Sequence, residues 1–290
     1  MEIIDARVRL PQELWGKPDY DLPALQREQY DRVLGLTDKV RAGTVNALLA
    51  DLDAAGVDRA VLHAEYESDA DADQLSAAVA GVVADYPDRF TGVGTITMPP
   101  ARPGHAAKQV AAAAELGLVG VNLQPAFFGL DIDDRALYPT YARAEELGMI
   151  VAVHTGITYS RAHPLRHERP ELLDQVACDF PELRLVACHA GWPWATEYAA
   201  VARRHPTVYL EFGGLAPKYV GRSGTGWDVL FGYLHNLLRD QVLFATDWPV
   251  LGHGRVLDEW RSLDLPEQVL GKLLGGNARS LFGLGAAATR

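Results

Sequence analysis

Residues 149–156 read MIVAVHTG, and residues 183–190 read LRLVACHA. Both runs are short and mainly apolar, and each contains a histidine near its end. Between them, residues 170–179 form an amphipathic run that is typical of a helix. Continuously apolar strands are expected where a parallel sheet is buried on both faces. This stretch therefore predicts a strand, a helix and a second, parallel strand.

The same alternation continues in both directions along the chain. Short apolar runs predict eight strands, over Ile3–Leu10, Arg59–Tyr66, Phe90–Met98, Leu118–Gln124, Met149–Gly156, Leu183–Ala190, Val208–Gly213 and Val242–Asp247. Longer runs rich in Ala, Leu, Glu and Arg predict helices, over Thr44–Ala55, Asp73–Asp85, His105–Leu116, Leu137–Leu147, Pro170–Asp179, Ala195–His205, Trp227–Leu238 and Arg255–Leu263.

The number of these units predicts the fold. Eight βα units in about 250 residues are the size of a TIM barrel. We therefore predict an α/β chain folded as a single-domain (β/α)8 TIM barrel over residues 1–290. A doubly wound open sheet is the second choice, because no glycine-rich dinucleotide-binding sequence follows the first strand.

Composition limits the class of protein. The chain has 290 residues, 48% of them hydrophobic, and no Pro/Ser-rich linker divides it, which favours one domain with a large core. Its net charge of −11 and the lack of a basic run argue against nucleic acids and anionic membranes as partners. Two cysteines, Cys178 and Cys188, and the lack of a leader-like or long apolar segment predict a reduced, cytoplasmic protein. Cys188 sits in an apolar strand and is expected in the core.

Polar side chains are concentrated where predicted strands end. His154, His189 and Asp247 follow three different apolar runs. The carboxyl ends of barrel strands form one rim, which carries the chemistry in TIM-barrel enzymes. A single histidine at a strand end is usually a hydrogen-bonded structural residue, but three such groups on one rim favour a catalytic site. We therefore assign the catalytic role to these three residues.

The first strand adds two permanent positive charges. If its side chains alternate strictly, one face carries Asp5, Arg7 and Arg9 and the other carries Ile4, Ala6 and Val8. Arginines are rarely buried without partners, so carboxylates or an anionic ligand must lie opposite them. His63 and Glu65, which end the second strand, could accept hydrogen bonds from both arginines. In a rival interpretation, His63 is a metal ligand.

Other residues join the predicted substrate site from loops. Gln124 ends the fourth strand, and Phe127 and Phe128 after it are expected either to form an apolar wall or to anchor a loop. Arg161 lies in a locally basic loop, residues 158–167, that could cover the mouth and attract an anion. Trp192 could shape a pocket for a planar substrate, as could two further tryptophans, Trp194 and Trp248, although tryptophan is also ordinary packing material.

Five segments together resemble the amidohydrolase superfamily. They are Leu137-Tyr138-Pro139 with Val153-His154-Thr155-Gly156, Val186-Ala187-Cys188-His189-Ala190-Gly191-Trp192-Pro193-Trp194, Phe244-Ala245-Thr246-Asp247-Trp248-Pro249, and Gly276-Asn277-Ala278-Arg279-Ser280-Leu281-Phe282-Gly283-Leu284. The branch they are most similar to is the amidohydrolase-2 group, which includes aminocarboxymuconate-semialdehyde decarboxylase, resorcylate decarboxylases and pyrone-dicarboxylate lactonase. The likeness runs from Ile3 to Leu284.

The resemblance implies a metal at the barrel mouth. In the family, its ligands are an HxH pair on the first strand, histidines after the fifth and sixth strands, and an Asp after the eighth. His154, His189 and Asp247 match this pattern, but Arg7 and Arg9 stand in place of the HxH pair. A guanidinium has no lone pair to offer a metal. We therefore predict a site without a cofactor, with residual Zn²⁺ on the three matching residues as the alternative.

The resemblance and the arginines together suggest the chemistry. Two guanidiniums would supply the charge that the family takes from a divalent cation. We expect a hydrolase that cleaves an ester, lactone or amide bond of a small carboxylated, cyclic or aromatic substrate, with Asp247 activating water and Arg7 and Arg9 holding a carboxylate or oxyanion. Decarboxylation is the second choice, because arginines that grip the departing carboxylate would stabilise the starting state. A non-catalytic anion-binding barrel is the third. Relatives in this group commonly form dimers, so a homodimer is expected.

Overall fold

The computed structural model describes residues 1–15, 24–65, 71–98 and 101–285, with side chains described from residue 28 onward in the second of these ranges. Its strands form one sheet in the order β1 to β8, and every neighbouring pair is parallel. Their bounds are β1 Ile4–Arg9, β2 Arg59–His63, β3 Phe90–Thr95, β4 Gly120–Leu123, β5 Ile150–His154, β6 Arg184–Cys188, β7 Val208–Glu211 and β8 Val242–Leu243.

The sheet closes on itself between its first and last strands. The amide of Ala6 donates to the carbonyl of Phe244 at 2.9 Å, and the amide of Arg9 donates to that of Trp248 at 2.9 Å. A β-bridge joins Val8 to Trp248 across the same seam. The predicted TIM barrel is therefore confirmed, with strands shorter than their apolar runs. Tyr66, expected at the end of the second strand, lies outside the described residues.

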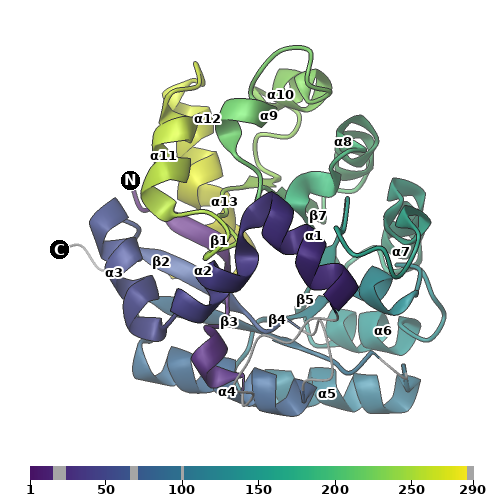
Figure 1. The fold of residues 1–290 in the computed structure, drawn as a ribbon. Coiled ribbons are helices and arrows are strands. Elements are labelled where there is room, and N and C mark those ends of the chain that lie inside the picture. Colours follow the sequence, from purple (N-terminus) through teal and green to yellow (C-terminus); the bar gives the residue numbers. More distant parts are fainter. Residues whose placement is uncertain (16–23, 66–70, 99–100, 286–290) are drawn as a thin grey trace.

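Helices surround the barrel (Figure 1). Their bounds are α1 Ala24–Leu34, α2 Leu36–Ala42, α3 Val45–Ala55, α4 Ala72–Asp85, α5 Pro103–Glu115, α6 Tyr138–Glu146, α7 Pro170–Asp179, α8 Ala195–Arg204, α9 Pro217–Val220, α10 Asp228–Leu234, α11 His253–Arg261, α12 Glu267–Gly271 and α13 Asn277–Leu281, with short turns η1 Gln12–Leu14, η2 Pro125–Phe128, η3 Leu165–Glu168, η4 His189–Gly191 and η5 Lys272–Gly276. No helix among the described residues is both long and apolar enough to span a membrane.

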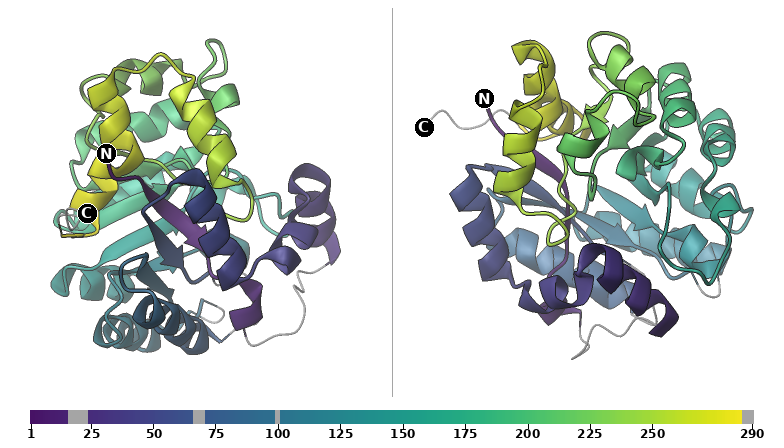
Figure 2. Two further views of the ribbon diagram at one scale, coloured as in Figure 1. Left: turned by 90° about the vertical axis from the view of Figure 1, so that its left-hand side faces the viewer. Right: turned by 45° about the horizontal axis from the view of Figure 1, so that its top comes forward.

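Local sequence explains where several helices begin. The side chain of Thr44 accepts the amide of Ala47 at the start of α3, and Asp71 accepts two amides at the start of α4. Proline occupies a first-turn position in α5, α6 and α7, where its missing N–H costs nothing. Among the helices that were not predicted, α1 and α2 lie across one end of the barrel, away from the outer ring (Figures 1 and 2).

The barrel interior is packed at one end and open at the other. Small and β-branched side chains from the strands fill its middle, and residues of α13 close the bottom; this inner cluster includes Ile4, Ala6, Val61, Val93, Ile150, Ala152, Val186, Leu243, Ala278 and Leu281. A second, larger cluster fills the layer between strands and helices. The polar carboxyl ends of the strands are left at the open end.

A β-bulge in β1 corrects the predicted alternation of side chains. Asp5 pairs with Ala60, but Val8 pairs with Leu62, so β1 holds one extra residue between these pairs. As a result, Val8 packs in the outer cluster and not with Ile4 and Ala6. Arg7 still reaches the barrel interior, whereas Asp5 binds Thr246 and faces α11. The prediction that Asp5 shares a face with the arginines was wrong.

Asp5 belongs to a buried charge network beneath the seam. Its carboxylate accepts the amide of Arg7 at 2.9 Å and the hydroxyl of Thr246 at 2.5 Å. His253, at the start of α11, lies between Asp5 (3.1 Å) and Asp51 of α3 (2.6 Å). Burial disfavours the charged imidazole, but hydrogen bonds and charges from both aspartates outweigh it and raise the pKa of His253 to about 9.

Replacing His253 should destabilise the protein in a pH-dependent way. A raised folded-state pKa contributes stability that is complete below the unfolded value of 6.5 and is lost as pH rises through about 9. We expect His253→Gln to lower the free energy of unfolding by about 3 kcal/mol more at low pH than at high pH. Urea unfolding on either side of this window measures the difference, and an equal loss at both pH values would contradict the assignment.

Candidate active site

Four of the predicted polar residues meet in one pocket at the open end of the barrel. Arg9 from β1, His154 from β5, His189 after β6 and Asp247 after β8 all line it. The other lining residues are mostly apolar or aromatic: Tyr30, Leu34, Ile157, Tyr159, Trp192, Gly213, Gly214, Leu215 and Val250. The space they surround, solvent at the mouth included, is about 550 Å³. The enclosed part of this space is only about 80 Å³.

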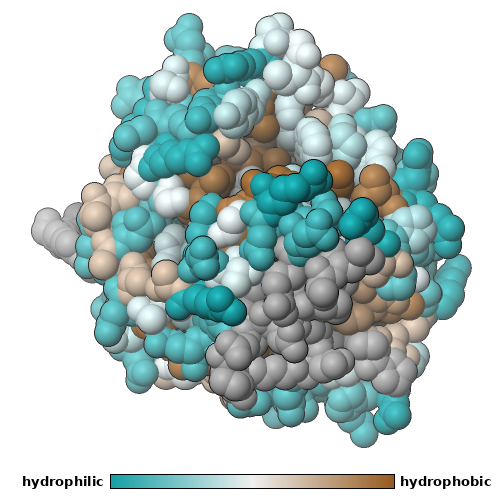
Figure 3. Space-filling view, in the orientation of Figure 1, coloured by the Kyte–Doolittle hydropathy of each residue, from teal (hydrophilic) through white to brown (hydrophobic). Residues whose placement is uncertain are grey.

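The pocket widens outward into a second, mostly apolar one. The two share Leu34, Tyr159 and Trp192, and the outer pocket adds Trp227 and Leu251. Figure 3 shows apolar side chains in a hollow near the centre of this face. A ligand at the polar floor therefore has apolar surface around and above it.

Two arginines and two carboxylates form the floor of the site. Glu65 contacts Arg7 Nη2 through Oε1 and Arg9 Nη1 through Oε2, the latter at 2.8 Å. Asp247 Oδ1 accepts from Arg7 Nε at 3.2 Å and from Arg9 Nε at 3.1 Å, and Oδ2 lies 3.3 Å from Arg9 Nη2. Each carboxylate thus bridges both guanidiniums, and the two positive charges meet two negative ones.

Asp247 is held as an anion in an unusual backbone conformation. Burial alone would raise its pKa, but the charges of Arg9 and Arg7 outweigh burial and hold the pKa at about 2. Its φ is 55°, in the left-handed region, and its amide donates to the carbonyl of Arg7 at 3.0 Å. His189 also has a positive φ, of 59°. Such strained non-glycine residues cluster at functional sites.

Arg7 lies below the pocket and is fully buried. Its Nη1 contacts His63 Nδ1 at 3.4 Å, Asn122 Oδ1 at 3.3 Å and Cys188 Sγ at 3.3 Å. Both ring nitrogens of His63 are engaged, because Nε2 lies 3.0 Å from the carbonyl of Ala6. Burial and the charge of Arg7 lower the pKa of His63 well below its usual value. The structure places His63 as a hydrogen-bonded neighbour of Arg7 and not as a free ligand.

Glu211, at the end of β7, is a second buried acid near Arg7. Its Oε2 lies 3.9 Å from Arg7 Nε, and its Oε1 accepts the amide of Gly213. Burial raises its pKa to about 8 despite the charge of Arg7. Glu211 is therefore protonated at neutral pH, and it adds no negative charge to the floor of the site.

His154 is paired with a buried acid, Glu168 of η3. Its Nδ1 contacts Glu168 Oε1. Burial, followed by the charge of Arg7, lowers the pKa of His154 to about 3, while burial raises that of Glu168 well above its usual value. Both shifts favour the uncharged forms of the pair. With Glu168 as the donor to Nδ1, neutral His154 carries its own proton on Nε2.

His189 has the opposite tautomer. Its Nδ1 lies 2.7 Å from the carbonyl oxygen of Gly213, which can only accept, so Nδ1 carries the proton and Nε2 the lone pair. Burial and the neighbouring His154 lower its pKa to about 3. The two rings lie 4.8 Å apart. The site thus presents one imidazole donor and one imidazole acceptor side by side.

The remaining predicted residues are divided between pocket and surroundings. Trp192 lines the pocket, and Phe127 packs edge-on against His154 at 5.1 Å. Gln124 is buried at the end of β4, just before η2. Arg161 is exposed and is not among the described pocket residues. In the same loop, Tyr159 and not Arg161 lines the pocket.

Sequence reasoning missed the residues that complete the site. Tyr30 and Leu34 come from the unpredicted helix α1, and the Tyr30 hydroxyl lies 3.1 Å from Thr158 Oγ1. Glu168 and Glu211 are the buried acids beside His154 and Arg7. The one available signal was that Glu211 lies near the end of a predicted strand, two residues before Gly213. Glu168 lies in a loop among basic residues and had none.

The donor set does not fit a divalent cation at this mouth. Arg7 and Arg9 occupy the first-strand positions that the family resemblance assigns to ligands, and their guanidiniums carry positive charge without lone pairs. Both oxygens of Asp247 already bind these groups. A divalent cation here would displace guanidinium contacts and be repelled by two positive charges, each by roughly 8 kcal/mol at about 4 Å and an effective dielectric of about 20.

Comparison with known proteins agrees with this architecture. The model of the amidohydrolase family matches residues 4–284. A 2-amino-3-carboxymuconate-6-semialdehyde decarboxylase from Dictyostelium discoideum is 26% identical over 243 residues, which are 73% of this chain and 66% of that protein. The match thus spans slightly less than two-thirds of the relative's length.

Solved structures extend the comparison to the whole chain. An uncharacterised TIM-barrel protein from Bordetella bronchiseptica is 29% identical, with a TM-score of 0.80 and coverage of 98% of this chain and 99% of that one. A 5-carboxyvanillate decarboxylase from Novosphingobium aromaticivorans, complexed with manganese, is 19% identical, with a TM-score of 0.70 and coverage of 98% and 96%. From the extent of the family match, we conclude that this chain belongs to the amidohydrolase family.

Proposed function

We propose that the protein is a decarboxylase of a small, planar aromatic or unsaturated carboxylic acid, and that it works without a catalytic metal. One observation carries the proposal: both arginines are already paired with Glu65 and Asp247. A substrate carboxylate in this mostly apolar pocket would lie near Arg9, whose positive charge is already balanced by Glu65 and Asp247. Loss of CO2 spreads or removes the negative charge, so poor solvation of the carboxylate favours the reaction.

This pairing removes the main reason for preferring hydrolysis. That preference assumed that Arg7 and Arg9 would grip the substrate carboxylate. Arg7 is fully buried and does not line the pocket, and Arg9 shares Asp247 and Glu65 with it. Hydrolysis also needs a base to activate water, and a pKa of about 2 makes Asp247 a weak one. The relative from Dictyostelium, named as a decarboxylase, supports the same choice.

His154 and Glu168 can deliver the proton that decarboxylation requires. The substrate carbon gains the proton of His154 Nε2 and loses CO2, and the electron pair of the broken C–C bond stays with that carbon. His154 Nδ1 takes the proton of Glu168 in the same exchange, so the imidazole remains neutral. Glu168 is left as a carboxylate. The pair is reset when His154 Nε2 takes a proton from water and Nδ1 returns its proton to Glu168. The net change is replacement of CO2 by a proton.

His189 and Asp247 complete the proposed set of catalytic residues. The lone pair of His189 Nε2 can accept a hydrogen bond from a hydroxyl or amino group of the substrate and so orient its ring. Asp247 keeps Arg9 neutralised and in place. Trp192 and Tyr159 provide apolar walls for a planar ligand. No step in this scheme requires a bound metal.

A substrate panel tests the reaction class. Chelator-treated protein would be incubated with hydroxybenzoates, aminobenzoates and unsaturated dicarboxylates, and with lactones and esters of similar size, while CO2 and product are measured. We expect CO2 release from at least one carboxylic acid, unchanged by added Mn²⁺ or Zn²⁺. Cleavage of lactones or esters alone would favour the hydrolase, and activity that returns only with metal would overturn the metal-free mechanism.

Glu168→Gln tests the proton relay. The amide can still hold His154 Nδ1 by a hydrogen bond, but it has no proton to give. We expect kcat to fall by about 100-fold with little change in KM. In the wild type, activity should fall as pH rises through the raised pKa of Glu168. Glu171→Gln, at an exposed acid in α7, is the matched control and should keep normal kcat. Equal activity of the two variants would remove Glu168 from the mechanism.

Asp247→Asn tests the charge balance of the floor. The amide keeps the shape of the carboxylate but leaves Arg9 with less negative charge. We expect a carboxylate inhibitor to bind about tenfold more tightly while turnover decreases, because the ground state is stabilised. Calorimetric titration with the inhibitor and with its neutral amide separates charge from shape, since only the anion should gain affinity. Weaker binding of the anion would contradict the assignment.

A further inference from the structure

A second group of metal-binding side chains lies far from the barrel mouth. Asp174 and Cys178 are four residues apart on α7, so they lie on one face of that helix. His205 follows the last residue of α8 and precedes β7 by two residues. His205 lies before the amino end of β7, whereas the catalytic pocket lies at the carboxyl ends of the strands. This group is therefore at the opposite end of the barrel.

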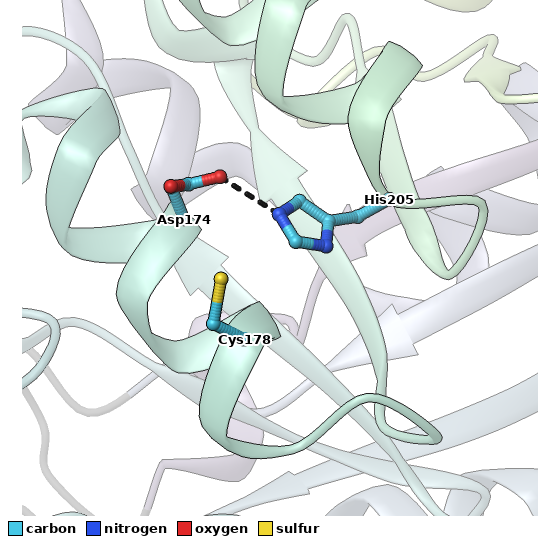
Figure 4. Close-up of side chains that lie close together, drawn as sticks. All are labelled: Asp174, Cys178 and His205. Atoms are coloured by element: carbon cyan, nitrogen blue, oxygen red, sulfur yellow. Dashed lines mark hydrogen bonds and ion pairs between the residues drawn. The ribbon is translucent and has the colours of Figure 1, made fainter.

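The three side chains converge on one point (Figure 4). One ligand atom of each, a carboxylate oxygen, a thiol sulfur and an imidazole nitrogen, lies within 4.8 Å of the other two. Zn²⁺ bound at about 2.0–2.3 Å needs tetrahedral ligands roughly 3.3–3.8 Å apart. Asp174 Oδ1 and His205 Nε2, now 2.7 Å apart in a hydrogen bond, would separate by about one ångström to reach that spacing.

Neighbouring contacts hold two of the three groups in place. The His205 carbonyl accepts from the amide of Val208 at 3.0 Å and from Gln241 Nε2 at 3.0 Å, which fixes the turn that carries the imidazole. The second oxygen of Asp174 accepts from Arg204 Nη1 at 2.6 Å, so Oδ1 is left to face the cluster. Such outer hydrogen bonds orient metal ligands. Arg204 is mostly exposed, so water screens its charge.

We propose that Asp174, Cys178 and His205 form a zinc site, with water as the fourth ligand, that joins the end of α7 to the turn between α8 and β7. The set of one sulfur, one nitrogen and one oxygen selects a borderline-soft cation and disfavours Mg²⁺ and Ca²⁺, which take oxygen ligands. Three protein ligands and one water are sufficient for Zn²⁺. The site is separate from the catalytic residues and does not depend on the proposed decarboxylation.

The two cysteines make the test selective. Cys178 is exposed, whereas Cys188 is buried, and burial raises the pKa of its thiol. A soluble alkylating reagent should therefore modify Cys178 first in the folded protein. We expect one equivalent of Zn²⁺, added to chelator-treated protein, to slow this modification at least about tenfold. Mg²⁺ at the same concentration should have no effect.

Variants separate a three-ligand site from a thiol that binds zinc alone. His205→Gln and Asp174→Asn should lose most of the protection, whereas His105→Gln, at an exposed histidine of α5, should keep it. Equal alkylation rates with and without zinc in the wild type would overturn the site, and so would full protection in His205→Gln. A thermal melt of each variant, recorded without metal, shows that it is folded.

Elemental analysis also distinguishes this site from the mouth. Protein equilibrated with zinc and then desalted should carry about one zinc per chain, and Cys178→Ser should carry none. Zinc retained by Cys178→Ser would overturn the assignment to this cluster and would locate a cation elsewhere, with the catalytic mouth as the first place to examine. The zinc content of Cys178→Ser tests the proposed zinc site, whereas the effect of added metal on turnover tests the metal-free mechanism. The two proposals can therefore fail separately.

Discussion

The active end of the barrel depends on neutralising two guanidiniums at the end of β1. Arg7 has no exposed surface, and removing an ion from water costs several kcal/mol unless partners replace the lost hydration. The partners come from the neighbours of β1 on both sides: Glu65 follows β2, and Asp247 follows β8. Because β8 has only two residues, the ion pairs reinforce a seam with few backbone hydrogen bonds. The same interaction that compensates the buried charge therefore also closes the barrel and positions Asp247.

Burial, more than the guanidiniums, decides which of the histidines and acids around the pocket carry protons. Burial and nearby positive charge both lower the pKa of His154 to about 3, so the imidazole stays neutral. Burial raises the pKa values of Glu168 and Glu211, and Glu168 lies beyond the arginine contacts. The shifts therefore favour protons on Glu168 and Glu211 over charged forms of His154 and His189, the reverse of the usual order in water, while Asp247 stays ionised. A neutral imidazole between a buried acid and the pocket is suited to passing a proton without becoming charged.

Sequence patterns predicted the parts of this structure that depend on periodicity. The apolar runs ending in His154, His189 and Asp247 are strands, and their common direction brings those three side chains to one pocket. The extra residue in β1 could not be predicted, because a bulge depends on pairing with β2 and leaves no pattern in β1 itself. Helix α1 was missed because the polar run at residues 26–29 interrupts its apolar pattern, and its place over the pocket depends on contacts such as that of Tyr30 with Thr158. Glu168 could not be identified from the sequence, because its contact with His154 depends on the conformation of the loop after β5.

The two ends of the barrel show how neighbours decide what a ligand set can do. At the mouth, His154, His189 and Asp247 match a metal-binding pattern, yet two buried arginines bind the carboxylate and repel a cation. At the opposite end, His205 and Asp174 face a thiol, and the neighbouring Arg204 is exposed and binds the other oxygen of the Asp174 carboxylate. Charge repulsion between buried groups is screened little, whereas repulsion at the surface is screened by water and salt. Residue type alone would therefore favour metal at the mouth, but the surrounding charges favour it at the end of α7.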